Sequence, residues 1–266
     1  LNSRLVLVTG GAGFIGSHLV DALMRRGAAV RVIDNLSNGI LENISRWLGH
    51  SSFEFIKGDL LNRNDLERAT EKCEVVFHLA ANPEVKIGSS KPEIHFEQNV
   101  LSTYRLLETL RRSESLESFI FTSSSTVYGD ASEIPTPEDY GPLKPISIYG
   151  ASKLASEALI SSFAYTYGFK AVICRLANII GPRSRHGVIY DFIKKLRKNP
   201  RELEILGDGT QRKSYLYIDD CISAILTALK RSHGKAEIFN LGSEDWVDVK
   251  TIAEIVMEEM GLKDVS

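Results

Sequence analysis

The sequence predicts an α/β protein built on a doubly wound parallel sheet, with a smaller C-terminal lobe. Short apolar segments alternate with helical segments along the first two thirds of the chain, as in sheets with helices on both faces. The first of these, residues 4–9, is a short run rich in β-branched and apolar residues, which is typical of a strand buried on both faces. The character of the chain changes after Asn178, where basic loops and short segments begin.

Length and composition narrow the possible classes of protein. The chain has 266 residues, 43% hydrophobic and 25% charged, and these values suit an ordinary globular protein. Its net charge of −2 gives no electrostatic reason to expect nucleic acid or an anionic membrane as partner. We find no apolar run of membrane-spanning length and no signal peptide, so we expect a cytoplasmic protein. The chain opens with Leu1 rather than methionine, which suggests a fragment of a longer protein.

The three cysteines are Cys73, Cys174 and Cys221. They lie far apart in the sequence, in apolar or helical surroundings. We therefore expect buried reduced thiols rather than a disulfide framework, and we expect no metal site.

A glycine-rich loop follows the first predicted strand and leads into a helix; its sequence is Gly10-Gly11-Ala12-Gly13-Phe14-Ile15-Gly16. Such a loop lets a pyrophosphate approach the helix N-terminus, where unpaired N–H groups favour an anion. The next predicted strand, residues 29–33, ends at Asp34. An acidic residue there can bind an adenosine ribose and would repel a 2′-phosphate, so we predict NAD rather than NADP. A glycine turn without a ligand is the alternative, and strand, helix and aspartate together disfavour it.

The alternation continues with strands at residues 53–57, 75–79, 118–122 and 171–175, and with helices at residues 62–72, 94–112 and 149–167. Ligands of doubly wound sheets bind at the carboxyl ends of the strands, so Asp59, residues 80–81 and Ser123 are predicted cofactor neighbours. Asp59 could equally be a helix cap or a turn residue. Asn99 falls inside a helix, where asparagine is unfavourable, so it either faces solvent or reaches toward the cofactor.

Five hydroxyl residues, 122–126, follow an apolar strand, and Tyr149 and Lys153 stand four residues apart at the start of an alanine-rich helix. Residues at this spacing share one helix face. A phenol and an ammonium group can therefore enter one site, and we expect the positive charge to lower the pKa of the tyrosine. A free tyrosine has a pKa of about 10, and bringing it near neutrality requires about 4 kcal/mol. A second cation is therefore expected as well.

We predict that residues 1–177 form the NAD-binding domain and residues 178–266 a smaller, substrate-binding lobe, apparently truncated at its C-terminus. Within the lobe we expect a strand at residues 203–206. Residues 214–242 show a strand, a helix and a strand, and are expected to pack on the main sheet. The basic residues of this region suit a phosphate-bearing substrate, although a solvated surface explains such charges more often.

The helices at residues 94–112 and 149–167 carry apolar side chains around more than one face. A helix whose apolar surface is wider than a single stripe is expected to be buried on two sides. We predict a homodimer formed through this helix pair. Full burial within the monomer is the alternative.

The glycine loop with Asp34, the serine-rich strand end and Tyr149-x-x-x-Lys153 together resemble the extended short-chain dehydrogenase/reductase family with its Rossmann fold. The resemblance covers essentially the whole chain. Within the family, the most similar group is the UDP-glucose 4-epimerases (UDP-galactose 4-epimerases), on the segments TGGAGFIGSHL, DNLS, SSSTVYGD, IYGASKLASE, GDGTQ and YLYIDD.

The resemblance implies an isomerase: NAD-dependent 4-epimerisation of a UDP-hexose, UDP-galactose or UDP-glucose, through a transient 4-keto sugar. It implies that Tyr149 takes the proton of the 4-hydroxyl group and that Ser124 hydrogen-bonds the same oxygen. Lys153 would hold the nicotinamide ribose and lower the tyrosine pKa, and the oxidised nicotinamide would be the second cation.

The family's binding residues transfer to matching positions of this chain. The implied cofactor-binding residues are Gly10, Gly13, Phe14, Ile15, Asp34, Asn35, Asp59, Leu60, Leu79, Ala80, Ala81, Asn99, Ser123, Tyr149 and Lys153. The implied substrate-binding residues are Ser124, Tyr149, Asn178, Val188, Arg212 and Lys213. The implied partner is a UDP-sugar, with neither nucleic acid nor membrane.

Two positions separate the reactions known in this family. The sugar-nucleotide 4,6-dehydratases carry an Asp–Glu pair where this chain has Ser125 and Thr126, and UDP-glucuronate decarboxylases carry Glu at the position of Thr126. The absence of a carboxylate argues against both reactions. The alternatives kept open are UDP-glucuronate 4-epimerase, UDP-GlcNAc 4-epimerase and UDP-glucuronate decarboxylase. A non-catalytic dinucleotide sensor is disfavoured by the intact Ser124, Tyr149 and Lys153.

The chain departs from the family at the substrate side. Leu176 stands where a tyrosine is common, and Lys213 where an arginine usually binds the diphosphate. Lysine cannot reproduce a bidentate arginine contact, so the diphosphate contact is expected to differ or to shift to Arg212. The usual C-terminal section, with another substrate-binding arginine, is absent from this sequence.

Overall fold

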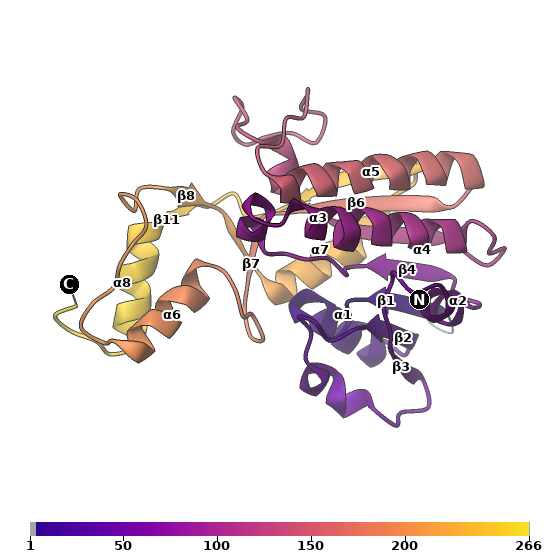
Figure 1. Cartoon of the computed structure of the whole chain (residues 1–266), viewed down its shortest axis with the longest axis horizontal. Coiled ribbons are helices and arrows are strands. Elements are labelled where there is room, and N and C mark those ends of the chain that lie inside the picture. The colour runs from indigo at the N-terminus through magenta and orange to yellow at the C-terminus, as the bar shows by residue number, and fades with distance from the viewer. Residues whose placement is uncertain (1–3, 266) are drawn as a thin grey trace. The chain divides into compact units, whose positions relative to one another are not determined.

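The computed structural model describes residues 4–265. The chain divides into two compact units (Figure 1): the first runs up to Leu176 and includes Asp219–Leu241, and the second holds Ala177–Ile218 and the residues from Gly242 onward. The assignment of NAD binding to residues 1–177 and of substrate binding to residues 178–266 stays a prediction. None of the helices in residues 4–265 has the length and apolar character needed to cross a membrane.

The first unit contains a seven-stranded sheet in which every neighbouring pair is parallel. The strands are β1 (Leu5–Thr9), β2 (Ala29–Asp34), β3 (Phe53–Lys57), β4 (Val75–His78), β5 (Ser118–Ser124), β6 (Lys170–Leu176) and β10 (Ala236–Leu241). Their order is β10-β6-β5-β4-β1-β2-β3, so the winding direction reverses between β1 and β4. This confirms the doubly wound α/β fold and puts the ligand-binding edge at the carboxyl ends of these strands.

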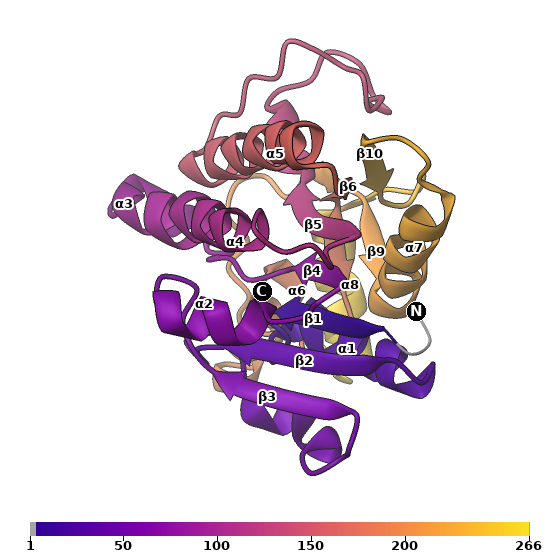
Figure 2. The same ribbon diagram turned by 90° about the vertical axis from the view of Figure 1, so that its right-hand side faces the viewer.

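Helices cover both faces of this sheet. They are α1 (Phe14–Arg25), α2 (Arg63–Thr70), α3 (Pro92–His95), α4 (Ser102–Leu110), α5 (Ile148–Tyr167) and α7 (Ile218–Arg231), with shorter helical turns η1 (Leu41–Trp47), η2 (Val85–Ser89), η3 (Phe96–Leu101) and η4 (Ser125–Tyr128). Figure 2 shows α2, α4 and α5 against one face and α1 and α7 against the other. Helix α5 begins at the Ser147 N-cap, whose hydroxyl accepts from the Gly150 N–H, and ends at Gly168 in the left-handed region, φ 93°.

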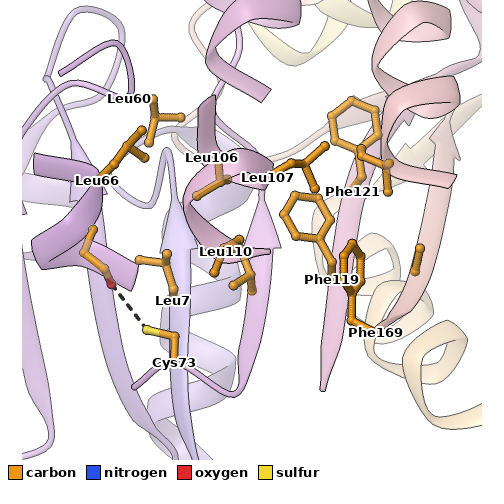
Figure 3. Packing of buried hydrophobic residues seen from close by; sticks show 14 of the residues in the cluster. Leu7, Leu60, Leu66, Cys73, Leu106, Leu107, Leu110, Phe119, Phe121 and Phe169 are labelled. Carbon is orange, nitrogen blue, oxygen red and sulfur yellow. Dashed lines mark hydrogen bonds between the residues drawn. The ribbon is translucent and has the colours of Figure 1, made fainter. Parts of the chain in front are cut away.

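The core under α2 and α4 joins leucines of the helices to phenylalanines of β5 (Figure 3). Cys73 lies within this core, and all three cysteines are buried and unpaired, as the sequence predicts. Burial raises the thiol pKa to about 11 at Cys73 and to about 12 at Cys174 and Cys221. Thiols with such pKa values stay protonated and unreactive at neutral pH. Among residues 4–265, no group of three or more His, Cys, Asp or Glu side chains could hold a metal ion.

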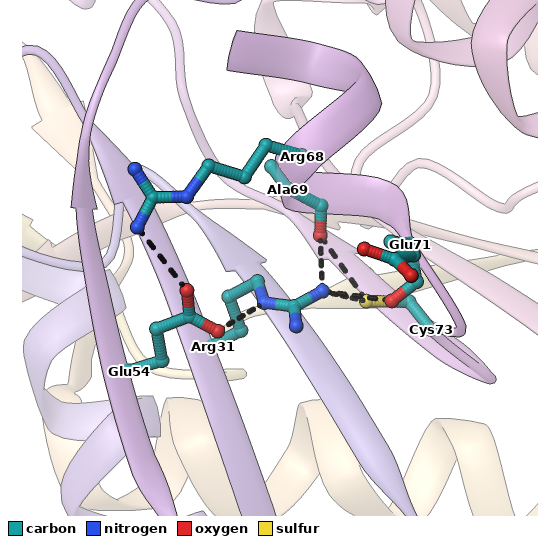
Figure 4. A network of polar contacts seen from close by, with 6 residues as sticks. All are labelled: Arg31, Glu54, Arg68, Ala69, Glu71 and Cys73. Atoms are coloured by element: carbon teal, nitrogen blue, oxygen red, sulfur yellow. Dashed lines mark hydrogen bonds and ion pairs between the residues drawn. The ribbon is translucent and has the colours of Figure 1, made fainter.

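A cluster of charged side chains ties α2 to the β2–β3 edge of the sheet (Figure 4). Arg31 of β2 donates from Nε to Glu54 of β3 at 2.7 Å. Its Nη1 donates to the carbonyl oxygens of Ala69, at 3.1 Å, and Glu71, at 2.8 Å. These carbonyls lie at the C-terminal end of α2, where a cation satisfies unpaired acceptors and the helix dipole.

The second unit packs α6 (Val188–Lys198) against α8 (Val249–Glu259) around its own small core. Two short strand pairs accompany them: β7 (Asn178–Ile180) with β9 (Tyr215–Tyr217), and β8 (Arg212–Lys213) with β11 (Val247–Asp248).

One expectation for this region is wrong, and a second is confirmed only in part. Residues 203–206 form no strand. Leu203 and Ile205 pack into the core of α6 and α8, so their alternation reflects contact with this core rather than strand structure. Residues 215–217 pair with β7 inside the second unit, whereas α7 and β10 belong to the first unit, where β10 extends the main sheet beside β6.

Candidate functional site

The glycine loop joins β1 to α1 at the carboxyl edge of the sheet. Gly10 has a φ of +69°, and a β carbon on Gly16 would overlap the carbonyl oxygen of Gly10, so this loop packs only with glycine at both places. Gly13 is the N-cap of α1 and has no side chain with which to cap it. The N–H groups of the first turn therefore remain for an external acceptor, and a diphosphate suits them.

Asp34 ends β2 beside this loop and is 8% exposed. Its two carboxylate oxygens accept from the N–H groups of Ala12, at 3.0 Å, and Leu36, at 2.8 Å. Burial raises the pKa of this carboxyl group, and the two backbone hydrogen bonds partly offset the rise. Each oxygen keeps a further lone pair. These free acceptor positions fit the hydroxyl donors of a ribose, so Asp34 and the glycine loop together fit NAD.

A chain of buried hydrogen bonds fixes the adjacent strand ends. The hydroxyl of Thr103 donates to the carbonyl of Asn99 at 2.6 Å, so it can only accept from His78 Nε2, 2.8 Å away. Nε2 therefore carries the proton, and Nδ1 accepts from Thr9 Oγ1 at 2.8 Å. Burial, and to a smaller extent the charge of Lys153, lowers the pKa of His78 to about 3.

This chain also positions predicted cofactor neighbours. Thr9 Oγ1 accepts from the N–H groups of residues 79 and 80, each at 3.2 Å. Sequence reasoning missed Thr9, His78 and Thr103. For Thr9 and His78, the available signal was a polar residue at the end of an apolar strand.

Asn99 lies in η3, a π-helical segment between α3 and α4, and is 2% exposed. Of the two alternatives for this residue, exposure to solvent is wrong. Its Oδ1 accepts from the Asn82 N–H at 2.7 Å, and its Nδ2 donates to Ser152 Oγ at 2.9 Å. Asn99 thus joins this helix to α5 and to the loop after β4. Its contact with the cofactor stays a prediction.

The structure brings Ser124, Tyr149 and Lys153 together. Ser124 is the last residue of β5, and the other two lie on the first turns of α5. Lys153 is 3% exposed, and its Nζ donates to the carbonyl of Thr122 at 2.9 Å. The same nitrogen lies 4.7 Å from the ring centre of Phe121 and 5.9 Å from that of Tyr149.

Burial favours the uncharged forms of both Tyr149 and Lys153. Burial raises the pKa of Tyr149 to about 12, and a hydrogen-bonding interaction with the side chain of Ser124 opposes the rise. Burial also lowers the pKa of Lys153 to about 7, against the charge of Glu157. The pKa of Tyr149 therefore lies above its ordinary value in this structure, because desolvation of the phenol prevails over the hydrogen bond. The lowering of this pKa by Lys153 stays a prediction. A phenolate here needs a further cation.

Ser123, a predicted cofactor neighbour, uses its hydroxyl inside the protein. It donates to Glu157 Oε1 at 2.5 Å, and Arg175 pairs with Glu157 at 2.8 Å. Arg175 also donates to the Tyr128 hydroxyl, which in turn donates to Asn240 of β10. This buried network, one helical turn beyond Lys153, was not predicted.

Two further predicted cofactor residues meet at the ends of β2 and β3. Asn35 Nδ2 donates to Asp59 Oδ2 at 3.1 Å, and Asp59 Oδ1 accepts from the Leu61 N–H at 2.8 Å. Asp59 is thus a turn residue, one of its two alternatives, and it still lies at the ligand-binding edge. Leu60 is 7% exposed and packs into the core.

The predicted substrate residues Asn178, Val188, Arg212 and Lys213 all belong to the second unit. Asn178 donates to the carbonyl of Ser214 at 3.0 Å. The guanidinium of Arg212 lies 3.8 Å from the ring centre of Trp246, a cation–π contact. Their roles stay predictions.

The doubly wound sheet, glycine loop and Asp34 define a dinucleotide-dependent enzyme. Residues 6–242 match the model of the NAD dependent epimerase/dehydratase family. The chain belongs to this family, and its cofactor is NAD.

Three similar proteins show the range of the family. A putative UDP-glucose 4-epimerase of Methanocaldococcus jannaschii is 36% identical over 97% of this chain and 83% of its own length. UDP-glucuronic acid decarboxylase 1 of Arabidopsis thaliana is 33% identical over 95% of this chain and 58% of its own. A crystal structure of a UDP-galactose 4-epimerase is 47% identical, with a TM-score of 0.89 over 98% of this chain and 84% of that one.

Proposed function

We propose that the chain catalyses NAD-dependent 4-epimerisation of a UDP-hexose, UDP-galactose or UDP-glucose, through a transient 4-keto sugar. The arrangement of Ser124, Tyr149 and Lys153 carries the proposal, because it supplies a proton acceptor, a hydrogen-bond donor and a cation in one place. The similarity to a UDP-galactose 4-epimerase, at 47% identity, supports the choice of reaction.

When bound, NAD supplies the hydride acceptor and donor for the sugar C4. The chain's own residues manage the proton. Tyr149 accepts the proton of the 4-hydroxyl group and later returns it, while Ser124 hydrogen-bonds the same oxygen. Because burial raises the pKa of Tyr149 to about 12, proton acceptance at neutral pH depends on positive charge beside the phenol. Lys153, whose pKa burial lowers to about 7, supplies part of it.

Decarboxylation of a UDP-uronic acid is the second candidate, because a UDP-glucuronic acid decarboxylase is 33% identical. Ser125 and Thr126 weigh against it, since neither offers a carboxylate for proton transfer. UDP-glucuronate and UDP-GlcNAc 4-epimerisation need the same residues in the first unit and differ in the sugar pocket.

The test is incubation of the protein with UDP-galactose, without added reductant, with products followed by NMR. Formation of UDP-glucose at constant total NADH supports the proposal. Carbon dioxide release from UDP-glucuronate, or net consumption of NADH, would contradict it.

We also propose that the protein is a homodimer formed through α4 and α5. Tyr104 of α4 and Tyr165 of α5 are 42% and 70% exposed, so the aromatic side chains of these helices are not fully buried in the monomer, and a second copy would cover them. Light scattering after size-exclusion chromatography tests this, and a monomeric mass at micromolar concentration would contradict it.

A further inference from the structure

The side-chain oxygen of Ser124 accepts two hydrogen bonds, both from Thr126. The Thr126 N–H donates to it at 3.3 Å, and the Thr126 hydroxyl donates to it at 3.0 Å. A hydroxyl oxygen has two lone pairs and one hydrogen. With both lone pairs used by Thr126, Ser124 can act on a neighbour only as a donor.

Thr126 is held firmly in this position. Its carbonyl accepts from the Gly129 N–H at 3.4 Å. A β carbon on Gly150 would lie 2.7 Å from that carbonyl oxygen, so α5 packs directly against Thr126 one residue after Tyr149. The next residue, Val127, is fully buried. These contacts fix the main chain of Thr126, and its hydroxyl lies 3.0 Å from Ser124 Oγ.

We propose that Thr126 is a positioning residue: its hydroxyl donates to Ser124 and thereby keeps the Ser124 hydrogen directed at the phenol oxygen of Tyr149. The inference deepens the proposed function and rests on it, because it assigns a role within the same proton transfer. In the proposed arrangement Thr126 touches neither the phenol nor the reacting sugar. It acts through Ser124.

The direction of the hydrogen bond between Ser124 and Tyr149 affects the charge on the phenol. A donated hydrogen bond stabilises a phenolate more than a neutral phenol, and the interaction with Ser124 does favour ionisation of Tyr149. Without the Thr126 hydroxyl, the freed lone pair of Ser124 can accept a proton from the phenol instead. A carboxylate at position 126 could only accept a hydrogen bond, so Ser124 would donate to it instead of to Tyr149.

The test compares Thr126→Val, which removes the hydroxyl at nearly constant shape, with Thr126→Ser, which keeps it. Thr166→Val, the same change at an exposed position near the end of α5, is the matched control. NMR of protein with isotope-labelled tyrosine and bound NAD follows ionisation at Cζ, and the Tyr149 signal is identified by its absence in Tyr149→Phe. This readout requires no turnover.

We expect Thr126→Val to raise the pKa of Tyr149 by roughly half a unit to one unit, the size of one hydrogen bond. The acid limb of kcat against pH should move upward equally, so that kcat below the limb falls about threefold to tenfold while KM stays within about twofold. Thr126→Ser should restore both values, and Thr166→Val should change neither.

An unchanged tyrosine pKa in Thr126→Val would overturn the inference. So would a Thr126→Ser variant as impaired as Thr126→Val, because that result would mean that the methyl group matters rather than the hydroxyl. Failure of the proposed function looks different: the unmodified protein would not convert UDP-galactose, yet the tyrosine pKa would still respond to Thr126→Val.

Discussion

The two parts of the candidate site are built by different means. The glycine loop and Asp34 are held by backbone N–H groups and by contacts that only glycine allows. Tyr149 and Lys153 lie in a buried setting that displaces both pKa values toward the uncharged forms. The first part is therefore sensitive to shape and the second to charge, and the comparison can be tested by perturbing each separately.

The largest effect is expected from Tyr149→Phe, which removes the proton acceptor and leaves the ring. Turnover should fall by about 10²–10⁴-fold, while NAD binding, measured by calorimetry, should be kept. Tyr217→Phe, at an exposed position of β9, is the control. An unimpaired Tyr149→Phe enzyme would remove Tyr149 from the mechanism.

Gly16→Ala tests the part that depends on shape. The added methyl group would overlap the Gly10 carbonyl oxygen, so α1 must shift, at a cost of about 1–3 kcal/mol in the free energy of unfolding. NAD affinity should fall in parallel, by roughly tenfold or more. Gly141→Ala, where a β carbon would meet open space, should change little. Normal stability and NAD affinity in Gly16→Ala would show that the loop is not tightly packed.

The last effect concerns charge and appears as a pH dependence of stability. Between the folded pKa of Lys153, about 7, and its ordinary value of 10.5, the unfolded chain binds a proton that the folded chain lacks. Stability should therefore rise with pH in this window, by about 1.4 kcal/mol per pH unit from this group. Urea unfolding of the cofactor-free protein at about pH 7.5 and 9.5 measures it, and Lys153→Met should lose that part of the slope. Equal slopes in both proteins would mean that Lys153 stays charged when folded.

Much of the sheet could be predicted from the sequence because its local signals agree. Residues 53–57 form β3 as predicted, and the helix expected at residues 149–167 begins one residue earlier. The sequence predicted only part of the chemistry of the site. The spacing of Tyr149 and Lys153 predicts that they share a helix face, but the sign of the tyrosine pKa shift depends on desolvation, which a spacing does not report.

Elements that depend on tertiary contacts were missed. The π-helical turn around Asn99 interrupts a helix predicted as continuous, and the partners of Asn99, at Asn82 and Ser152, come from elsewhere in the chain. The buried Glu157–Arg175 pair joins α5 to β6 and leaves no short-range pattern. Residues 203–206 show the reverse case, because Leu203 and Ile205 pack into the core of the second unit without forming a strand.

The order in which the strands appear along the chain has a consequence for synthesis on the ribosome. Strand β10 is the last to join the main sheet, after the whole segment 177–218 of the second unit has been made. Until then β6 is an open sheet edge, and Tyr128 lacks its partner Asn240. A nascent chain released before residue 236 would expose the edge of β6 to pairing with other chains, so completion of the first unit depends on translation through most of the second.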